Sequence, residues 1–398
     1  MDGYAVQAKD TIGADELKPV ELNLTGRIRA ENISPLILNT NETIEVATGS
    51  NLPLGSDSVI PIEDTKELGK TVQIKKSLTD FSYVLQAGKD FKKDDLLIQK
   101  GQKLDEIHIS TLAAMGKNKV FVYDKLQVAV ISTGYEIKPP GKTLKPGEVY
   151  DINSFSLRTK LQKQNCNPRF FGIISDDIKK LKDVISKALK TCDIILITGG
   201  SSSGPGDLAY KIFNEFSSIY LFHGILMKPG KPTGFGLIEG KPAFVLPGNP
   251  LSCYMMFDQL VSILFNNEKN NQNKKITAKL GKRHFVAKGR KEFLPINLLT
   301  WKNNNVAYPS IGSSGAITRI LNSDGMIEIP KNIDILLENE SVSVSLFKHY
   351  QSPDFYIFGD IDPIIQFASW HVKTQNNLII KLINEGPSLS FKIANDFP

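Results

Sequence analysis

The first group of residues able to do chemistry is a hydroxyl and carboxylate cluster at the end of an apolar run. Ser132, Thr133 and Gly134 close that run, and Glu136 follows two residues later. Oxygen ligands at the end of a buried strand are suited to a polar ligand or to Mg²⁺. A helix-capping turn with a solvated Glu136 explains the same residues about as well.

The second group is a glycine-rich loop that runs from residue 199 to residue 207. Its candidate ligand-binding residues are Gly199, Gly200, Ser202, Gly204 and Asp207. The glycines allow the backbone to come close to a ligand, and free amides ahead of a helix bind anions. No Gly-Lys-Ser/Thr follows, so the loop is not a Walker A motif. The loop predicts a phosphate or a pterin-like ligand. A flexible linker is the weaker reading, since a buried strand and a helix bound the loop.

The third group is a basic turn that contains Lys228 and Lys231, held by Pro229, Gly230 and Pro232. A lysine binds phosphates and oxyanions as a compact point charge. Taken without its context, a solvated surface turn would be the favoured interpretation.

The fourth group combines the ends of two further loops with the starts of two helices. In the segment 247–252, Pro250 suits the first turn of a helix, and the backbone amides that precede it would point at a ligand. In the segment 150–154, Asn153 or Ser154 is predicted to cap a helix. The candidate residues are Asp151, Asn153, Ser154, Pro247, Gly248, Asn249, Pro250 and Ser252.

Several other kinds of chemistry are excluded by spacing. The five histidines show no metal-ligand pattern, and the three cysteines form no CxxC pair. This argues against a disulfide scaffold and against a zinc or iron–sulfur site. Cys166, Cys192 and Cys253 are predicted to be buried and inert.

Length and composition predict an ordinary multidomain protein. The 398 residues suggest two to four domains, with 41% apolar and 23% charged residues. The net charge of +6 is spread along the chain, so it does not indicate nucleic-acid binding but suits anionic small ligands. The sequence has no apolar run of the ~18 residues of a membrane span and no export signal. A cytoplasmic protein without membrane contact is expected.

The first part of the chain, residues 1–123, is predicted to be a β region with one linking helix. Short β-like runs are broken by glycine, proline and aspartate. The helix is expected at Ile107–Met115, with Gly116 as its stop. The expected strands are Val20–Gly26, Glu42–Ala47, Ser58–Ile62, Thr71–Lys75 and Lys119–Tyr123.

Residues 124–265 change to alternating strands and helices, which predicts a three-layer αβα domain around a parallel sheet. Ligands bind such sheets at the carboxyl ends of the strands, where the loops above are located. Expected strands are Leu126–Ser132, Pro168–Ile174, Asp193–Thr198, Ile219–Phe222 and Ala243–Leu246, and expected helices are Ser154–Gln164, Asp176–Lys190, Asp207–Phe216 and Leu251–Phe265.

The remaining chain is predicted to contain a linker at 266–275, a small β-barrel domain at 276–347 and an αβ segment at 348–398. The last segment has a strand–helix–strand pattern at Phe355–Phe358, Pro363–Lys373 and Asn377–Ile383. About fifty residues are too few to close a core of this kind alone.

These loops, in this order, resemble the molybdopterin molybdenumtransferase family, which includes MoeA and the E domain of gephyrin. Further matching motifs lie on both sides of the loops, and together they cover residues 1–347. They are Met1-Asp2-Gly3-Tyr4-Ala5, Ala47-Thr48-Gly49-Ser50-Asn51-Leu52-Pro53, Gly55-Ser56-Asp57-Ser58-Val59, Gly88-Lys89-Asp90, Gly101, Leu112-Ala113-Ala114-Met115-Gly116, Gly289-Arg290-Lys291-Glu292-Phe293, Ser313-Ser314-Gly315 and Ile329-Pro330.

The resemblance implies insertion of molybdenum into adenylylated molybdopterin, with release of AMP, during molybdenum cofactor biosynthesis. It implies that the central αβα domain binds molybdopterin, with Mg²⁺ as cofactor, molybdate or tungstate as substrate and a homodimer as the active form. A molybdopterin adenylyltransferase is a further expected partner. The substrate supplies its own dithiolene sulfurs, so the absence of paired cysteines fits.

The resemblance also implies roles for particular residues. Asp2 and Thr48 would act from the partner subunit, with support from Asp90, while Glu136 and Asp207 would be catalytic and bind the metal. Lys228 and Lys231 would hold the anionic substrate. The remaining implied substrate-binding residues are Ser132, Thr133, Gly134, Asp151, Asn153, Ser154, Asp176, Asp177, Gly199, Gly200, Ser202, Gly204, Pro247, Gly248, Asn249, Pro250, Ser252, Arg290, Ser313 and Ser314.

The sequence departs from the family pattern at three places. The family usually has an acid where this chain has Pro205, and it usually carries a further segment ahead of the Met-Asp-Gly-Tyr-Ala motif. The segment 348–398 extends past the common family end and resembles the start of a periplasmic-binding-like domain. Two alternatives therefore stay open: a molybdopterin- or oxyanion-binding scaffold without turnover, and an adenylyltransferase-like activity of the αβα domain.

Overall fold

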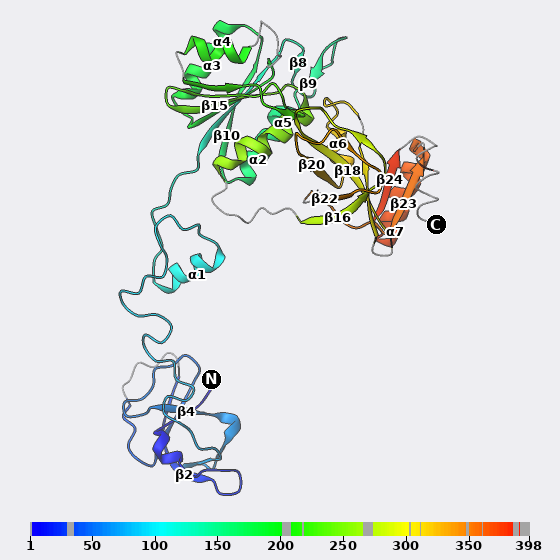
Figure 1. Cartoon of the computed structure of the whole chain (residues 1–398). Helices are drawn as coiled ribbons and strands as arrows, with labels where there is room; N and C mark the ends of the chain where they lie inside the picture. The colour runs from blue at the N-terminus through cyan, green and yellow to red at the C-terminus, as the bar shows by residue number, and fades with distance from the viewer. Residues whose placement is uncertain are drawn as a thin grey trace. The chain divides into compact units, whose positions relative to one another are not determined.

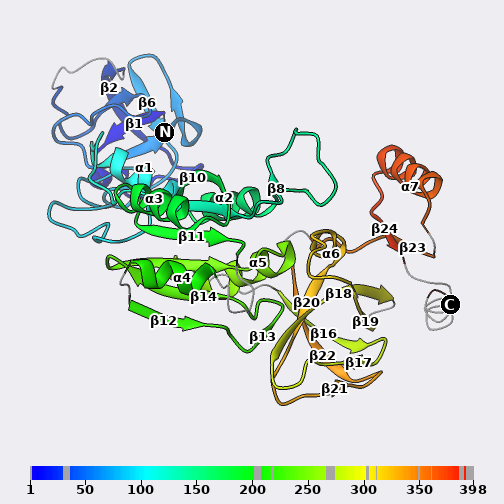
Figure 2. The same ribbon diagram turned by 90° about the horizontal axis from the view of Figure 1, so that it is seen from above.

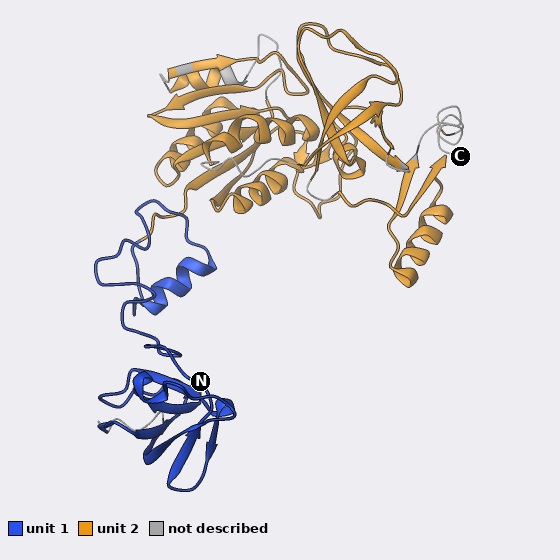
Figure 3. Cartoon of the chain, turned by 60° about the horizontal axis from the view of Figure 1, so that its bottom comes forward, with its two compact units in different colours: residues 1–121 blue, residues 122–398 orange. Residues whose placement is uncertain are grey.

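The computed structural model describes residues 2–29, 36–200, 208–216, 219–265, 274–301, 304–310, 312–347, 350–359, 361–384 and 390. The chain divides into two compact units, residues 1–121 and residues 122–398, which are coloured separately in Figure 3. Each unit is described here by itself. None of the helices among the described residues combines the length and the apolar character needed to cross a bilayer.

The first unit contains a six-stranded sheet in the order β4-β1-β3-β2-β6-β5. The strand β1, which the sequence did not predict, is buried along its whole length, and a Cβ on Gly3 would lie 2.1 Å from the carbonyl oxygen of Ile60. The Asp-Gly-Tyr-Ala motif therefore forms a strand in which only glycine fits at its first position. The strands are β1 Gly3–Val6, β2 Val20–Ile28, β3 Glu42–Val46, β4 Ser58–Pro61, β5 Thr65–Glu67 and β6 Thr71–Ile74.

The segment that follows the sheet holds helix α1, Glu106–Ala114, close to the predicted helix. The Asp105 carboxylate accepts hydrogen bonds from the amides of Ile107 (3.0 Å) and His108 (3.1 Å), which fixes the helix start. The predicted strand Lys119–Tyr123 is wrong, because the segment is irregular and pairs with no other strand among the described residues. Its apolar side chains remain exposed, Phe121 fully so.

The central domain of the second unit is built on a sheet in the order β10-β7-β11-β15-β14-β12. The first four strands are parallel, but β14 is antiparallel to both neighbours, so the sheet is mixed rather than parallel throughout. Glu239 and Gly240, both with positive φ, join β14 to β15 by a tight turn, which leaves no room for a crossover helix. The strands are β7 Gln127–Thr133, β10 Asn167–Ile174, β11 Ile194–Thr198, β12 Ile219–His223, β14 Gly234–Ile238 and β15 Lys241–Leu246.

Helices cover both faces of this sheet, as Figure 1 shows. Alternate residues of β7 point to opposite faces, Val128 and Val130 into one apolar cluster and Ala129 and Ile131 into another. Helices α2 and α5 pack in the first cluster and helices α3 and α4 in the second, which gives the three predicted layers. The helices are α2 Asn153–Lys163, α3 Ile178–Leu189, α4 Leu208–Glu215 and α5 Pro250–Met256. The predicted long helix Leu251–Phe265 instead continues from α5 as one π turn (Phe257–Val261) and one 3-10 turn (Ser262–Leu264).

A five-stranded barrel follows, closed in the order β18-β19-β16-β22-β20 with β20 pairing back to β18. The short strand β13, Met227–Lys228, pairs in parallel with the start of β18 and thereby joins the central domain to the barrel (Figure 2). The barrel strands are β16 Lys275–Leu280, β18 Lys291–Trp301, β19 Asn304–Pro309, β20 Gly325–Ile329 and β22 Ser341–Leu346, with β17 His284–Phe285, β21 Ile335–Leu336 and helix α6 Thr318–Asn322 beside them.

The final described segment forms β23 Phe355–Gly359, α7 Pro363–Asn376 and β24 Ile380–Asn384, which confirms the predicted strand–helix–strand pattern. This segment shares a core with the barrel, since Ile383 packs with Leu299 and Tyr308. The Lys381 ammonium also pairs with the Asp324 carboxylate, and both side chains are nearly buried. The barrel therefore supplies the core that so short a segment lacks.

Replacing Lys381 with methionine should loosen this segment from the barrel. The change leaves the Asp324 carboxylate buried without its cation, and breaking such a pair costs about 3 kcal/mol. We expect faster hydrogen exchange in residues 355–384 and an earlier unfolding transition. The control is Lys373→Met at an exposed position of α7. Equal exchange in the two variants would contradict the role of the ion pair.

Candidate active site

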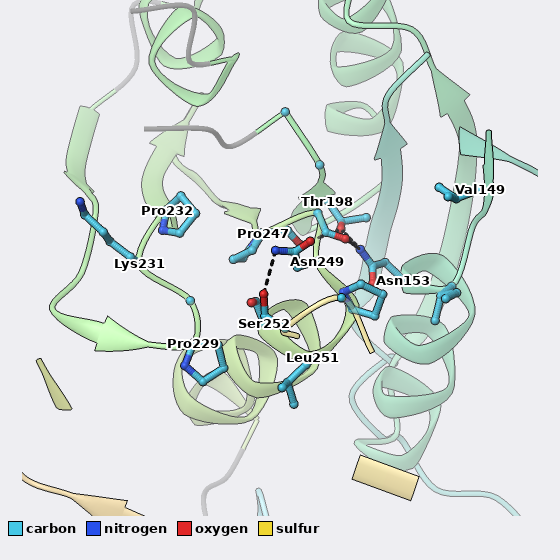
Figure 4. Close-up of a pocket in the computed structure, with 18 of the residues that line it drawn as sticks. Val149, Asn153, Thr198, Pro229, Lys231, Pro232, Pro247, Asn249, Leu251 and Ser252 are labelled. Atoms are coloured by element: carbon cyan, nitrogen blue, oxygen red, sulfur yellow. Dashed lines mark hydrogen bonds between the residues drawn. The ribbon is translucent and has the colours of Figure 1, made fainter. Parts of the chain in front are cut away.

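A pocket of about 1060 Å³ lies in the second unit, where the strand ends of the central sheet meet the barrel. Its walls come from the loops after β7, β11 and β15, from the turn after β13, and from β17, β18 and the segment leading into α6. Figure 4 labels lining residues from the end of β11, the loop after β15, the turn after β13 and the start of α2. The pocket is therefore where the topology of a doubly wound sheet predicts a ligand.

Seventeen of the residues that the sequence singled out line this pocket. They are Ser132, Thr133, Glu136, Asp151, Asn153, Asp176, Gly199, Gly200, Lys228, Lys231, Pro247, Gly248, Asn249, Pro250, Ser252, Arg290 and Ser314.

The other predicted residues fall into three groups. Gly134, Ser154, Asp177 and Ser313 neighbour the lining residues in the chain but do not line the pocket. Asp2, Thr48 and Asp90 belong to the first compact unit. Ser202, Gly204 and Asp207 lie outside the described residues.

The close approach of the strand-end loops depends on Gly199. Its φ is +101°, and a Cβ there would lie 2.2 Å from the carbonyl oxygen of Thr133. A Cβ on Gly248 would in turn lie 3.4 Å from the Gly199 Cα. The loops after β7, β11 and β15 therefore touch one another through backbone atoms, and the residues that they carry reach one pocket.

Asp151 organises the hydroxyl end of the pocket. Its Oδ2 accepts a hydrogen bond from Ser132 Oγ (2.9 Å), and its Oδ1 accepts one from the amide of Ser154 (3.0 Å). The prediction that Asn153 or Ser154 caps α2 is wrong, because Asn153 is already the first helical residue and Asp151 supplies the capping oxygen. Asp151 is nearly buried, so its carboxylate is held in one orientation.

Asn153 links the loops after β11 and β15 from the start of α2. Its Nδ2 donates to Thr198 Oγ1 (2.7 Å) and to the carbonyl oxygen of Gly248 (2.8 Å). Its Oδ1 is buried and has no hydrogen-bond partner among the described residues. The side chain therefore fixes the spacing of the two loops. Figure 4 shows the bond to Thr198.

Two hydrogen bonds join the loop 247–252 to the barrel. Asn249 Nδ2 donates to Ser314 Oγ (3.0 Å), and the amide of Leu251 donates to the Ser314 carbonyl oxygen (3.1 Å). Pro250 is the first residue of α5, as predicted. The Leu251 amide, which follows Pro250, is therefore used by the barrel.

Glu136 and Asp176 bring two carboxylates to the acidic end of the pocket. Burial raises the pKa of Asp176, and the charge of Glu136 raises it further. Neither carboxylate forms an ion pair within the described part of the chain. The described residues contain no group of three or more metal-ligating side chains. Mg²⁺ typically takes one or two carboxylates together with substrate phosphates, so this pair fits that ion.

The side of the pocket formed by β13 and the barrel is cationic and contains residues that the sequence analysis did not assign to the site. Lys228, Lys231 and Arg290 lie there, joined by Arg319, whose guanidinium donates to the Gly312 carbonyl oxygen (2.8 Å). Lys211, Thr198, His284 and Glu292 also line the pocket. Glu292 lies two residues after Arg290 in the motif 289–293, so the sequence could have indicated it as a site residue. No local sequence pattern indicates Arg319, Lys211, Thr198 or His284.

Asp2 and Thr48 form a separate polar group in the first unit. Asp2 Oδ1 accepts hydrogen bonds from the Thr48 amide (2.7 Å) and from Thr48 Oγ1 (2.8 Å). These bonds lower the pKa of Asp2. Both residues are exposed or nearly so, and Asp90 is also exposed.

Comparison with known families gives matches along most of the chain. The family described as MoeA N-terminal region (domain I and II) matches residues 1–116. The family described as probable molybdopterin binding domain matches residues 129–266, and the MoeA C-terminal region (domain IV) matches residues 277–347.

Individual relatives agree with these matches. A putative molybdopterin biosynthesis protein of Methanocaldococcus jannaschii is 32% identical over 356 residues, 87% of this chain and 85% of the relative. A molybdopterin molybdenumtransferase of Staphylococcus epidermidis is 28% identical over 333 residues, 83% of this chain and 80% of the relative. The solved structure of a molybdopterin biosynthesis MoeA protein from Pyrococcus horikoshii has a TM-score of 0.73 and 38% identity, and the match covers 88% of this chain and 87% of that one.

Replacing Gly199 with alanine should open the contact between the strand-end loops. Gly240→Ala is the control, since Gly240 has a φ of +76° but no atom within 4 Å of the place that a Cβ would take. Both variants carry the strain of a left-handed alanine, and only Gly199→Ala adds a backbone clash. We expect Gly199→Ala to lower the free energy of unfolding by about 2 kcal/mol more than the control. Equal denaturation midpoints would show that the loops do not need this contact.

Proposed function

The chain belongs to the MoeA family of molybdopterin molybdenumtransferases, enzymes of molybdenum cofactor biosynthesis, and we propose that it inserts molybdenum from molybdate into adenylylated molybdopterin. In this reaction water cleaves the bond between the pterin phosphate and AMP, AMP leaves, and the dithiolene sulfurs ligate molybdenum. The observation that carries the proposal is one pocket lined by two carboxylates from the loops after β7 and β10 and by several cations from the β13 turn and the barrel.

The cationic side suits the oxyanion and the phosphates of this substrate. Molybdate is a tetrahedral dianion, and lysine, arginine and hydroxyl groups are its natural hydrogen-bond donors. We assign this role to Lys228, Lys231, Arg290 and Ser314. Tungstate has the same shape and charge and fits the same groups.

The cysteines of the chain agree with sulfur ligands that come from the substrate. Cys166, Cys192 and Cys253 are all free and buried, as expected. Burial raises the pKa of Cys253 to about 12. A thiol of this kind is a poor metal ligand, because the thiolate is the form that binds.

The acidic end suits Mg²⁺, which we assign to Glu136 and Asp176, with Asp207 as a further proposed ligand. When bound there, Mg²⁺ would neutralise the phosphate charge of the adenylylated substrate. Asp151 and Ser132 would orient the substrate beside it. Asp207 lies outside the described residues, so its place stays a prediction.

We further propose that the active form is a homodimer in which Asp2 and Thr48 act at the pocket of the partner subunit. The exposed apolar side chains around α1 support an association of this kind. They include Ile107 and Ile109 on the helix and Phe121 after it. A supply of substrate by a molybdopterin adenylyltransferase and a cytoplasmic location stay predictions.

Loss of either acidic side chain should raise the requirement for Mg²⁺. With adenylylated molybdopterin and molybdate as substrates, we expect Glu136→Gln and Asp176→Asn to raise the half-saturating Mg²⁺ concentration at least about tenfold. The measurement is molybdate-dependent AMP release. Asp183→Asn, at an exposed position of α3, is the control and should leave the Mg²⁺ dependence unchanged.

The wild-type chain decides between turnover and a scaffold. If it binds molybdopterin tightly but releases no AMP when molybdate is added, the transferase proposal fails in favour of the scaffold. Transfer of AMP from ATP to molybdopterin would instead indicate the adenylyltransferase-like activity.

At a Mg²⁺ concentration far below the half-saturating value of Glu136→Gln, a mixture of the Asp2→Ala and Glu136→Gln variants should recover activity if Asp2 acts across a dimer. In a dimer of Asp2→Ala and Glu136→Gln subunits, one site carries both changes and the other carries neither. Random mixing should therefore restore about a quarter of the wild-type AMP release. Each variant alone, unfolded and refolded by the same procedure, is the control. Activity no greater than that of the two separate variants would contradict sharing of the site.

A further inference from the structure

Glu292 is a buried carboxylate in the cationic wall of the pocket, with 3% of its surface exposed. Its Oε1 accepts hydrogen bonds from Lys228 Nζ (3.0 Å) and His284 Nε2 (3.1 Å), and its Oε2 accepts one from the amide of Ala287 (2.8 Å). Burial alone raises the pKa of Glu292, but these three bonds outweigh it and lower the pKa to about 2. The side chain therefore carries a full negative charge in a fixed orientation.

The backbone sets Glu292 directly beside Lys228. The two residues are register partners in the parallel pairing of β13 with β18. The amide of Lys291 donates to the Leu226 carbonyl oxygen (2.9 Å), which closes the same ladder at its start. A barrel residue therefore determines where the lysine of the central domain can go.

Lys228 keeps donors for a ligand after it has bonded to Glu292. An ammonium group has three N–H donors, and the contact with Glu292 Oε1 uses one of them. The Lys228 side chain is 47% exposed, whereas that of Glu292 is only 4% exposed. The lysine is thus anchored at its buried side and open at its pocket side.

We propose that Glu292 is a positioning residue that aims the Lys228 ammonium at the anionic substrate. The inference rests on the proposed function, because it treats an oxyanion or phosphate as the ligand of Lys228. Glutamine at 292 would preserve the positive charge of Lys228 but replace its ionic anchor with a neutral, weaker one. Anion binding and turnover should therefore respond differently to this change.

The kinetic test separates placement of the charge from its presence. With Mg²⁺, molybdate and adenylylated molybdopterin, we expect Glu292→Gln to lower kcat about tenfold or more while KM for molybdate rises no more than about twofold. Lys228→Met should raise KM, since the charge itself is lost. Glu292→Asp should restore part of kcat, because it keeps a carboxylate one methylene short of the lysine. Glu328→Gln, which removes an exposed ion pair with Lys291 on the neighbouring strand, should change neither constant.

A second readout follows Lys228 directly and does not depend on turnover. We expect an amine-acylating reagent, with mass spectrometry of the peptides, to modify Lys228 several-fold faster in Glu292→Gln than in wild type or Glu328→Gln. Acylation needs the Lys228 nitrogen to meet the reagent, and in wild type the contact with Glu292 Oε1 holds that nitrogen against the pocket wall.

Several results would overturn the inference. The first is an unchanged kcat in Glu292→Gln while the wild type is active. The second is a lower kcat with an unchanged rate of Lys228 acylation. The third is a lower kcat that returns to the wild-type value when rates are normalised to the amount of folded protein. A wild-type chain that releases no AMP would refute the proposed function. The acylation experiment would still decide whether Glu292 anchors Lys228.

Discussion

The close approach of three strand-end loops at Gly199 is the constraint on which the pocket depends. Because Gly199 has no side chain, the loops after β7, β11 and β15 meet through backbone atoms. The Asn153 amide can then bond to Thr198 and Gly248 at once. A doubly wound sheet always places its strand ends at one edge. The glycine brings them close enough for one small ligand to contact all three loops.

The barrel contributes to the pocket mainly through charge and through fixed loops. Ser314 uses both its hydroxyl and its carbonyl oxygen to hold the start of α5, and Glu292 holds Lys228. The two acids, Glu136 and Asp176, come from the central domain instead. The cationic wall thus combines lysines of the central domain with arginines of the barrel, whereas both of these acids come from the central domain alone.

The sequence predicted most elements of the central domain because its strands are continuous apolar runs bounded by glycine and proline. It missed β14, where glycine at positions 234 and 236 hides the strand pattern, and it therefore predicted a fully parallel sheet. It missed β1 because its four residues, Gly3–Val6, are too few to show the alternating pattern of a strand. Lys119–Tyr123 has strand-forming residues, but no partner strand is available to it among the described residues. Pairing between distant segments decides these cases, and no local pattern contains that information.

The part of the candidate site that belongs to the central domain could be predicted from the sequence, but the part that belongs to the barrel could not. Loops that follow strands of one sheet must converge, so the residues of the central domain could be grouped from the sequence. Glu292 and Arg319 enter from the barrel, and only the pairing of β13 with β18 brings the first of them to Lys228. The roles assigned to the residues of the first unit depend on the resemblance and on the proposed dimer.

The local geometry of Asp2 limits the role that it can have in that dimer. Thr48 bonds twice to Oδ1 and leaves Oδ2 without a bond among the described residues, so one oxygen is held and the other is available. The lowered pKa of Asp2 makes this carboxylate a weak base, whereas an efficient general base has a pKa near the working pH. A weak base with one fixed oxygen is better suited to orienting a water molecule by accepting its hydrogen bond. We therefore expect Asp2 to align the attacking water in the proposed hydrolysis, while the cationic groups of the pocket stabilise the charge that develops on the departing phosphate.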